Sequence, residues 1–484
     1  MPELLTLSPP PVAEAPSQAA RCARLLLAGL AVGAGVAALL PLPHPAAGPN
    51  AFQPADLAWM LSASGLVLLM TPGLAFFYGG MVSARNVIST MLQSFIALGI
   101  ISLLWYGVGF SLAFGDSWHG LVGDPRTFFC FNNVGTAAHP RVGPSLPLLL
   151  FATFQLKFAV ITPALITGAL AERVRFTSYL LFISLFCLFV YCPLAHWAWH
   201  PDGLLAQWGV LDFAGGTVVH ISAGFAALAG VRALGPRHGY QPGSAAAPVN
   251  MPYVLLGTGL LWFGWFGFNA GSALGANALA VTAFFNTHLA GAAAMCTWLL
   301  LEVAQGRRPS ALGACVGAVV GLVAITPAAG YVSYGASVFI GVLAATTSTG
   351  ALWLKHRTTL DDTLDVFPCH GVGGIVGMLA TALFATQGGL LMGGGPRLLG
   401  YHVLALGLVA GFTFGGSWLL LRLTNWLLPL RVGAHAEAVG LDVSQHGELG
   451  LPPTTPVAEP QEAWLTADEV AESLPALNWT STKS

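Results

Sequence analysis

Long apolar stretches separated by short polar breaks make up most of this chain and constrain its fold more than any other feature. Each is close to the roughly 20 residues that an α-helix needs to cross a bilayer. Only 8% of the 484 residues are charged, against about a quarter in an ordinary soluble domain, so lipid is needed to cover the apolar surface. Eleven such stretches lie at about 57–81, 88–114, 146–171, 177–196, 213–234, 251–271, 278–303, 310–327, 331–349, 366–386 and 399–427. We therefore predict an all-α polytopic membrane protein with eleven transmembrane helices.

The same composition argues against several other classes of protein. A formal net charge of -2 provides no basic excess for binding nucleic acid. The seven cysteines lie mostly inside apolar runs without CxxC spacing, which indicates neither a disulfide framework nor a metal site. The chain has no HExxH or GxSxG motif, so an intramembrane hydrolase is a poor interpretation. We expect no enzyme activity and no cofactor.

The first 47 residues have the order of a signal peptide. Arg21 and Arg24 precede the apolar run 25–40, and small residues follow at 45–48. A short anchor helix that stays attached is the alternative. The predicted organisation is a signal peptide over 1–47, a transmembrane domain over 48–428 and a cytosolic tail over 429–484.

Basic residues are distributed unevenly between the two sides of the predicted membrane. If the N-terminus lies outside, nine Lys and Arg residues fall in inner loops and three in outer loops. This bias predicts an external N-terminus and a cytosolic C-terminus in the cell membrane, meaning a plasma or inner membrane. In the tail, residues 466–473 fit a short capped helix, with disorder as the alternative. The inner residues are Arg85, Arg173, Arg175, Arg232, Arg237, Arg307, Arg308, Lys355 and Arg357, and the outer ones are Arg126, Arg141 and Arg397.

A duplicated pattern indicates that the helices form two related halves. In each half an Asp is followed eight positions later by a His and four positions after that by a Gly. Inverted repeats of this kind place corresponding helices around one site near the membrane midplane. We therefore predict a five-plus-five inverted repeat with one extra helix. The two sets are Asp212, His220 and Gly224 in the fifth stretch, and Asp362, His370 and Gly374 in the tenth.

Few ionisable side chains lie inside the predicted spans, and each is a candidate for function because charge is costly in hydrocarbon. His220 and His370 fit a pair of pore-lining imidazoles, with two satisfied core histidines as the alternative. His288 and His402 lack such a pattern and are better explained as packing residues. Lys157 either faces a pore mouth or points to a subunit interface or the external surface, and we favour the second placement.

Aromatic residues near the outer ends of the spans form a second group of candidates. Trp199, Phe158 and Ser272 would form a cation site if the fold brought them together, because ring faces attract cations and a hydroxyl accepts a hydrogen bond. The alternative is ordinary packing and an interfacial aromatic belt. Sequence spacing alone does not distinguish these possibilities.

Five motifs in order resemble those of the ammonium transporter family (Amt/Mep/Rh), in its bacterial Amt-like branch. The resemblance covers about residues 55–448 and implies an eleven-helix fold that is usually a homotrimer with one pore per subunit. The matching motifs lie at 71–80, 168–176, 212–220, 262–272 and 362–374.

The resemblance also implies roles for individual residues. His220 and His370 are similar to the family's twin pore histidines, and Phe158 and Phe268 to the stacked gate above them. An external ammonium recruitment site is implied at Trp199 and Ser272, with Phe154 as a further external aromatic residue. Asp212 is similar to the essential acid beside that site. The segment 440–448 resembles the family's cytosolic tail, where a PII-type signal protein often docks.

These features predict an ammonium transporter or channel that serves nitrogen uptake. NH4+, or methylammonium, is expected to bind externally and to lose a proton near the gate. NH3 would then pass the histidines, with net proton movement favoured over neutral conduction. An ammonium sensor that signals through the extended tail is the alternative. A sodium-coupled permease is a further possibility, which replacement of sodium would test.

Overall fold

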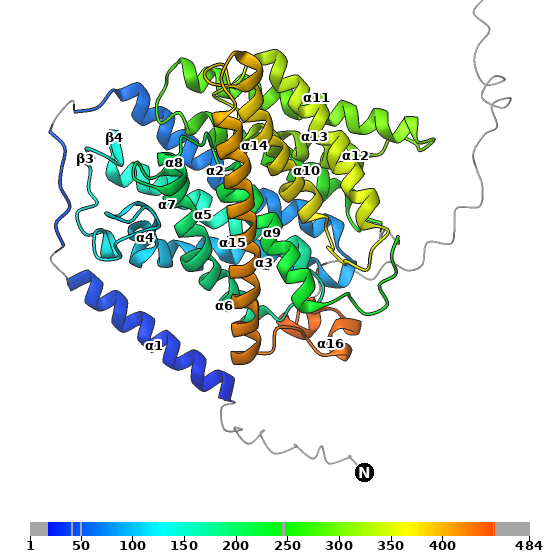
Figure 1. The fold of residues 1–484 in the computed structure, drawn as a ribbon. Coiled ribbons are helices and arrows are strands. Elements are labelled where there is room, and N and C mark those ends of the chain that lie inside the picture. Colours follow the sequence, from blue (N-terminus) through cyan, green and yellow to red (C-terminus); the bar gives the residue numbers. More distant parts are fainter. Residues whose placement is uncertain (1–17, 40–41, 49–50, 244–246, 449, 451–484) are drawn as a thin grey trace, which may run out of the picture.

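The fold is a bundle of membrane-length helices (Figure 1). A computed structural model describes residues 18–39, 42–48, 51–243, 247–448 and 450. Within these residues, ten helical segments are long and apolar enough to cross a membrane. The prediction of a helical polytopic membrane protein is therefore confirmed. These segments are Pro54–Met81, Ala84–Phe114, Leu148–Leu170, Phe176–Gln207, Gly216–Leu234, Met251–Gly271, Ala278–Ala304, Tyr334–Lys355, Phe367–Phe384 and Arg397–Leu427.

The eighth predicted stretch, 310–327, forms the shorter helix α12 (Ala311–Ile325). Its 15 residues are fewer than the 17 or so that cross a bilayer without help. Most of it is buried among neighbouring helices, so it does not need the length of a lipid-facing span. The predicted count of eleven full spans therefore becomes ten long segments and one short core helix.

The elements of the first half follow the predicted order. Several spans are interrupted by π-helical turns, here η2, η4 and η5, which widen the backbone ladder locally. In chain order, and apart from the loop at 115–145, the helical elements of the first half are α1 (Gln18–Leu39), α2 (Pro54–Met81), η1 (Ala84–Asn86), α3 (Val87–Leu104), η2 (Trp105–Gly109), α4 (Phe110–Phe114), α5 (Leu148–Leu170), α6 (Phe176–Phe186), η4 (Cys187–Tyr191), α7 (Cys192–Trp199), α8 (Leu204–Gln207), η5 (Gly216–Ile221) and α9 (Ser222–Leu234).

The second half repeats this plan and ends in the tail. Its tenth predicted span again begins with a π-helical turn, η6. The elements are α10 (Met251–Gly271), α11 (Ala278–Ala304), α12, α13 (Tyr334–Lys355), η6 (Phe367–Val372), α14 (Gly373–Phe384), η7 (Leu390–Met392), α15 (Arg397–Leu427), α16 (Ala434–Val439) and η8 (Asp442–His446).

The long loop at 115–145, which follows the second predicted stretch, is partly regular. It contains two antiparallel hairpins, with Ser117 opposite Gly123 in one and His139 opposite Gly143 in the other. Three of the four strands have only two residues, which is too short to leave an alternating pattern in the sequence. The elements are β1 (Ser117–Trp118), β2 (Val122–Gly123), η3 (Phe129–Phe131), β3 (Ala138–His139) and β4 (Gly143–Pro147).

The first helices of the two predicted halves, α2 and α10, pack closely along each other. Glycines make this approach possible: a Cβ added at Gly257 would lie 2.3 Å from the backbone nitrogen of Phe77. On the other helix, a Cβ at Gly80 would lie 2.6 Å from the carbonyl oxygen of Asn250. Small residues serve this purpose in membrane proteins, where packing drives helix association.

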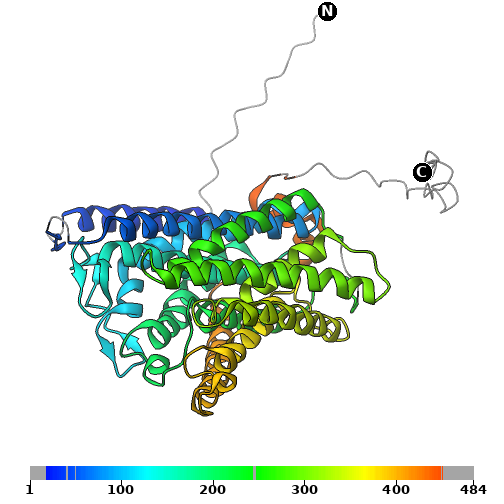
Figure 2. The same cartoon turned by 90° about the horizontal axis from the view of Figure 1, so that it is seen from above.

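Seen from above, the blue α2 and the orange α15 lie at opposite sides of the bundle (Figure 2).

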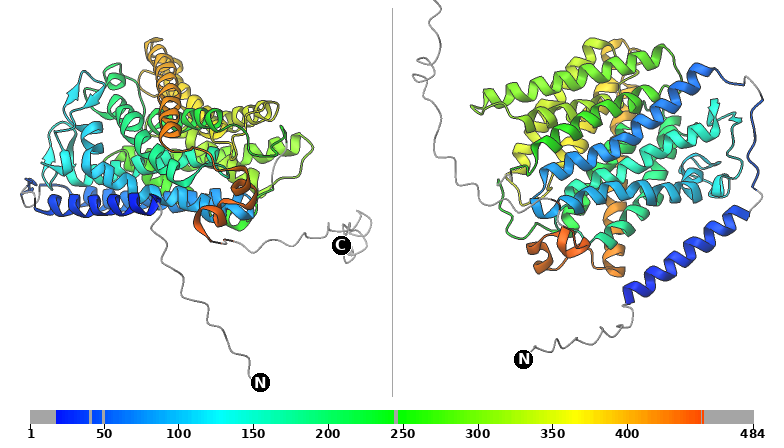
Figure 3. Two further views of the ribbon diagram at one scale, coloured as in Figure 1. Left: turned by 90° about the horizontal axis from the view of Figure 1, so that it is seen from below. Right: turned by 180° about the vertical axis from the view of Figure 1, so that it is seen from behind.

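The helix α1 lies at the margin of the bundle (Figure 3). The segment that follows it, 42–48, runs against the external loop. The carbonyl of Pro43 accepts a hydrogen bond from the Asn133 N–H at 2.8 Å, and that of Pro45 accepts one from the Ala137 N–H at 2.9 Å. The predicted signal peptide 1–47 includes this docked segment, and its cleavage stays a prediction.

The described part of the tail folds back onto the face that carries the loops predicted to be cytosolic (Figure 3). The carboxylate of Asp442 accepts hydrogen bonds from the N–H groups of Ile88 and Ser89, at 3.0 and 2.7 Å. These are first-turn donors of α3 that have no partner within the helix. The segment 440–448 therefore caps a helix of its own chain. The helix predicted at 466–473 lies outside the described residues.

Candidate functional site

Asp212 holds the start of the helix that carries His220. Its carboxylate accepts hydrogen bonds from the N–H groups of Gly215, Gly216 and Thr217, at 2.9, 2.6 and 2.7 Å, and from the Thr217 hydroxyl. These donors open the π-helical turn η5, where no backbone acceptor precedes them. The carboxylate is thus engaged by the chain itself and acts on the site by fixing the backbone.

Asp362 performs the same task in the second half. Its carboxylate accepts from the N–H groups of Val366 and Phe367 at 3.0 and 2.7 Å, at the start of η6. Burial raises the pKa of Asp362 to about 6, while the ammonium group of Lys355 opposes this rise. The duplicated spacing therefore has a structural cause: each Asp caps a helix, and each His lies about two turns farther along.

The two capped helices bring His220 and His370 into direct contact. Their Nδ1 atoms are 3.2 Å apart, and the ring centroids are separated by 5.4 Å at an interplanar angle of 23°. Both rings are at least 96% buried. Nε2 of His220 has no hydrogen-bond partner, whereas the Nδ1 atoms share one hydrogen bond. One imidazole must therefore donate through Nδ1 and the other must accept.

The glycines of the duplicated pattern make room for this contact. A Cβ at Gly224 would lie 2.4 Å from the backbone of Gly371, immediately after His370. A Cβ at Gly374 would lie 2.9 Å from the side chain of Ile221, immediately after His220. The two broken helices therefore cross where each has no side chain, which sets the histidines side by side.

Two phenylalanines separate the histidines from the face that we predict to be external, called the outer face below. The rings of Phe158 in α5 and Phe268 in α10 have centroids 4.3 Å apart, and both are about 1% exposed. Phe268 lies 6.0 Å from the His220 ring, and Phe158 lies 5.7 Å from the Trp199 ring. A continuous column of five rings thus leads from Trp199 through the phenylalanines to His220 and His370.

A cavity of about 130 Å³ lies at the outer end of this column. The structure brings Trp199, Phe158 and Ser272 together at this cavity. The indole N–H of Trp199 donates to the Asp212 carbonyl at 3.1 Å, and the Ser272 hydroxyl donates to the Phe268 carbonyl at 2.8 Å. The lining residues are Val142, Phe151, Gln155, Phe158, Trp199, Phe213, Ser272 and Leu274.

Phe154 is not among these lining residues, contrary to its predicted place in the recruitment site. Its side chain is fully buried behind Phe158, with ring centroids 5.0 Å apart, and it packs against Gly271. It packs where α10 approaches α2, next to Gly271 and Ala63. Gln155 and Phe213 line the cavity instead, and our sequence analysis missed both. The apolar residues around Gln155 left no periodicity to show which side of α5 faces inward.

Two further cavities continue the path inward. A small cavity of about 10 Å³ lies between the gate residue Phe268 and the two histidines. Apart from the histidines, its lining residues are apolar or aromatic. It has roughly the volume that a single water-sized molecule needs. A larger one of about 240 Å³ begins at His370 and is lined by charged residues, including Glu302, Lys355 and Asp365. His370 borders both cavities and therefore marks the inner end of the narrow part.

Lys157 does not line any of these cavities. It is partly exposed and shares the outer side of α5 with Leu149 and Thr153. The ring of Phe158, the next residue, points into the bundle instead. The side chain of Lys157 is thus directed away from the mouth, toward what surrounds the subunit.

The remaining span histidines have ordinary surroundings. In His402, Nδ1 lies 2.9 Å from the Met378 carbonyl and Nε2 accepts the Leu211 N–H at 3.0 Å. His402 therefore contacts the segment that carries Asp212. His288 is exposed and packs beside the Trp262 ring with centroids 5.6 Å apart.

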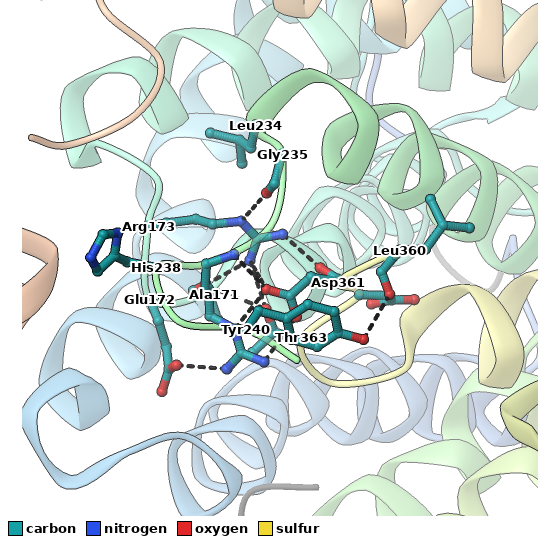
Figure 4. Close-up of polar contacts among 12 residues, drawn as sticks. Ala171, Glu172, Arg173, Leu234, Gly235, His238, Tyr240, Leu360, Asp361 and Thr363 are labelled. Carbon is teal, nitrogen blue, oxygen red and sulfur yellow. Dashed lines mark hydrogen bonds and ion pairs between the residues drawn. The ribbon is translucent and has the colours of Figure 1, made fainter. Parts of the chain in front are cut away.

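A buried ionic cluster joins loops at the end of the bundle that we predict to be cytosolic, called the inner end (Figure 4). Arg237 contacts both carboxylate oxygens of Asp361 and reaches Glu172 at 2.7 Å. Arg173 donates to the Asp361 carbonyl at 2.6 Å and to the Thr363 hydroxyl at 2.7 Å. The cluster unites loops that are up to 190 residues apart in the chain.

The arginines determine the charge state of the acids in this cluster. Burial by itself raises the pKa of Asp361, but Arg237 and Arg173 outweigh it and hold the pKa below its ordinary value. In the same way, Arg237 and the Ser83 N–H overcome the effect of burial on Glu172 and lower its pKa. Both groups are therefore carboxylates at neutral pH, and the cluster fixes the inner ends of the helices that carry the histidines.

A column of rings linking two cavities inside a bundle of membrane-length helices defines a membrane transport protein. The family is shown by comparison with known proteins. A model of the Ammonium Transporter Family matches residues 58–451, and the chain belongs to this family. The resemblance found in the five motifs is thereby confirmed.

Individual proteins are similar over most of their length. A putative ammonium transporter of Methanothermobacter thermautotrophicus is 45% identical over 405 residues, which cover 82% of this chain and 98% of the relative. The crystal structure of Saccharomyces cerevisiae Mep2 is similar with a TM-score of 0.77 and 34% identity, over 84% of this chain and 93% of that one. A solved structure described as a sensor Amt protein matches with a TM-score of 0.75 and 33% identity, over 81% of this chain and 98% of its own.

Proposed function

We propose that this protein transports ammonium by binding NH4+ in the outer cavity, removing one proton near the gate and passing NH3 along the two histidines. The observation that supports this most directly is the column of rings from Trp199 to His370 between two cavities. The relatives named ammonium transporters support the substrate. No part of the proposed path requires a cofactor.

The narrow part of the path is unsuited to an intact cation. Even by the mildest scale, a charged side chain at the bilayer centre costs about 2.5–3.5 kcal/mol, and the lining between gate and histidines offers little compensation. Neutral ammonia avoids this cost and still forms hydrogen bonds. Selection among cations therefore belongs to the outer cavity.

The outer cavity can replace the interactions with water that ammonium gives up when it binds. The faces of Trp199 and Phe158 attract a cation, and Ser272 keeps acceptor capacity because its hydrogen is committed to the Phe268 carbonyl. Potassium is attracted by rings too, but it has neither a hydrogen to donate nor a proton to release. Asp212 contributes indirectly, through the backbone that it holds and the carbonyl that orients Trp199.

The histidine pair is suited to relay the proton that ammonium leaves behind. A neutral imidazole accepts a proton on one nitrogen while it gives up another, and its ordinary pKa near 6.5 makes both forms accessible. The shared Nδ1 hydrogen bond provides the link between the rings. Movement of the proton along this pair makes the overall transport electrogenic.

Purified protein in liposomes tests this proposal. An ammonium concentration jump should produce a current, and an equal potassium jump should not. Replacement of both histidines by leucine should abolish the current. An unchanged current and selectivity in that double variant would contradict the relay, whereas ammonia flux without current would leave only neutral conduction.

An ammonium sensor is the second candidate, and the similarity to a structure described as a sensor Amt protein favours keeping it. A sensor would bind ammonium with negligible flux and would change its tail contacts on binding. The liposome experiment separates the two functions, because a sensor gives no current while ammonium still binds.

We further propose the expected topology and assembly. The cluster at Arg173 and Arg237 and the described tail share one face of the bundle, which fits a cytosolic side rich in basic loops. A homotrimer and a PII-type partner at this face are expected from the family resemblance. Truncation after Leu427 that leaves both transport and PII binding intact would contradict a regulatory role of the tail.

A further inference from the structure

Gln155 has an unusual environment in the outer cavity. The residue is 8% exposed and lines the cavity, and its covered amide oxygen has no hydrogen-bond partner among the residues that the structure describes. It lies on α5 almost one turn before Phe158, so both side chains face the cavity. Buried acceptors in native proteins nearly always have a donor, and an exception requires an explanation.

The other polar groups of the cavity make the character of this site clear. The Trp199 N–H and the Ser272 O–H both donate to backbone carbonyls. The oxygen of Ser272 and the ring faces remain available to a bound cation, and the side chain of Gln155 lies beside them in the lining of the cavity. A cavity that offers acceptors and π-faces fits a small cation that can only donate hydrogen bonds.

We propose that Gln155 is a further ligand of the transported cation and accepts one of its N–H groups through Oε1. This inference rests on the proposed transport function and adds a specificity-determining residue to it. Because the amide is neutral, it binds the cation by a charge-assisted hydrogen bond without holding it as tightly as a carboxylate would. In this structure Oε1 is covered by neighbouring atoms, so the terminal amide must rotate to turn Oε1 toward the cation, and the charge of the cation favours that rotation.

The proposal also predicts how substrates are ranked. Ammonium has four N–H donors and methylammonium has three, so an additional acceptor favours ammonium. Loss of this acceptor should therefore weaken ammonium more than methylammonium. A purely structural role of Gln155 would not produce this difference.

The chain offers a matched control in Gln93 of α3. This glutamine is also buried and also has an unpartnered Oε1, but it does not line the outer cavity. Leucine at either position removes the amide at nearly constant size. A third variant, Gln155→Glu, keeps an acceptor at the site and should rescue binding.

The experiment measures current against ammonium and methylammonium concentration for the wild type and the three variants in liposomes. Gln155→Leu should raise the apparent KM for ammonium about tenfold, the loss expected for one hydrogen bond to a charged group, with a smaller rise for methylammonium. Gln93→Leu should leave both KM values unchanged, and Gln155→Glu should match the wild type or bind more tightly.

Two results would overturn the proposal: an unchanged ammonium KM in Gln155→Leu, or equal rises for both substrates. If Gln155→Leu does not fold, Gln155→Glu still decides, because a ligand role requires its KM at or below that of the wild type. A wild type with neither current nor ammonia flux would refute the transport function instead. Calorimetric titration of wild type and Gln155→Leu with ammonium chloride would then decide the ligand role separately.

Discussion

The Nδ1 atoms of His220 and His370 lie 3.2 Å apart at the crossing of two helices, each of which is capped by an aspartate eight residues earlier. The arrangement allows one shared hydrogen and leaves the Nε2 atom of His220 without a partner. Each half of the chain thus supplies one capped helix, one imidazole and one glycine at the crossing.

The first prediction concerns this pair. His220→Leu alone should remove the proton link and lower ammonium-driven current at least about 100-fold, because a relay of two sites does not work with one. His288→Leu, which removes an exposed ring, is the control and should conduct like the wild type. Solid-supported membrane recordings on both variants would measure this. A single variant with half of the wild-type current would show that the proton takes another route.

The second prediction concerns His402, which lies outside the path. It links the Met378 carbonyl to the Leu211 N–H, next to the Asp212 that orients Trp199. His402→Leu would leave both backbone groups unpaired, at about 1–3 kcal/mol each, and should raise the ammonium KM by loosening the cavity.

His402→Gln should restore the KM, because its amide also offers one donor and one acceptor. The rescue separates positioning of the mouth from mere loss of core volume. Equal KM values in both variants would exclude the positioning role.

Much of this site was open to prediction because its residues recur at fixed spacing. The Asp212 and Asp362 patterns predicted two corresponding helices, and the structure shows that they meet. Gln155 was not predictable, because most of α5 is apolar and its few polar residues follow no helical period. The ionic cluster could not be predicted from the sequence either, because Arg173 and Asp361 come from loops that are far apart in the chain and meet only in the folded protein.

The third prediction concerns the ionic cluster of Arg173, Arg237, Glu172 and Asp361, which should make the stability of the protein depend on pH. The pKa values of Glu172 and Asp361 are lowered in the folded protein. Their contribution is therefore complete above the ordinary carboxyl pKa of about 4 and is lost as the pH falls through the lower folded values. The unfolding temperature in detergent should be constant from neutral pH to about pH 5 and should decrease below it.

Arg237→Gln should lower the stability at neutral pH by about 3–5 kcal/mol and flatten this acid limb. Arg126→Gln removes a solvent-exposed ion pair and should leave the curve unchanged. A steep acid limb that persists in Arg237→Gln would assign the pH dependence to other groups.

The fourth prediction concerns the segment after α1. Pro43 and Pro45 accept backbone hydrogen bonds from the external loop, and a Cβ at Gly135 would lie 2.1 Å from the Pro45 carbonyl. Backbone pairing of this kind favours a segment that stays in place. We expect the mature protein to contain residues 42–47, and N-terminal sequencing of the purified protein should find its first residue before Leu42. A mature chain that begins at Gly48 would show instead that the predicted signal peptide is removed whole.

The fifth prediction concerns Lys157, the charged residue nearest to the gate in sequence. Because it faces outward while Phe158 faces inward, its charge should not act on a cation in the cavity. Lys157→Met should leave the ammonium KM and the current at every concentration unchanged, and low salt should not reveal a difference, since screening is weakest there. Leu156→Lys adds a second charge next to Lys157 on the same side of α5. This control shows whether a charge on that surface affects transport at all. A lower KM in Lys157→Met that fades with added salt would show that the ammonium group of Lys157 repels the substrate at the mouth.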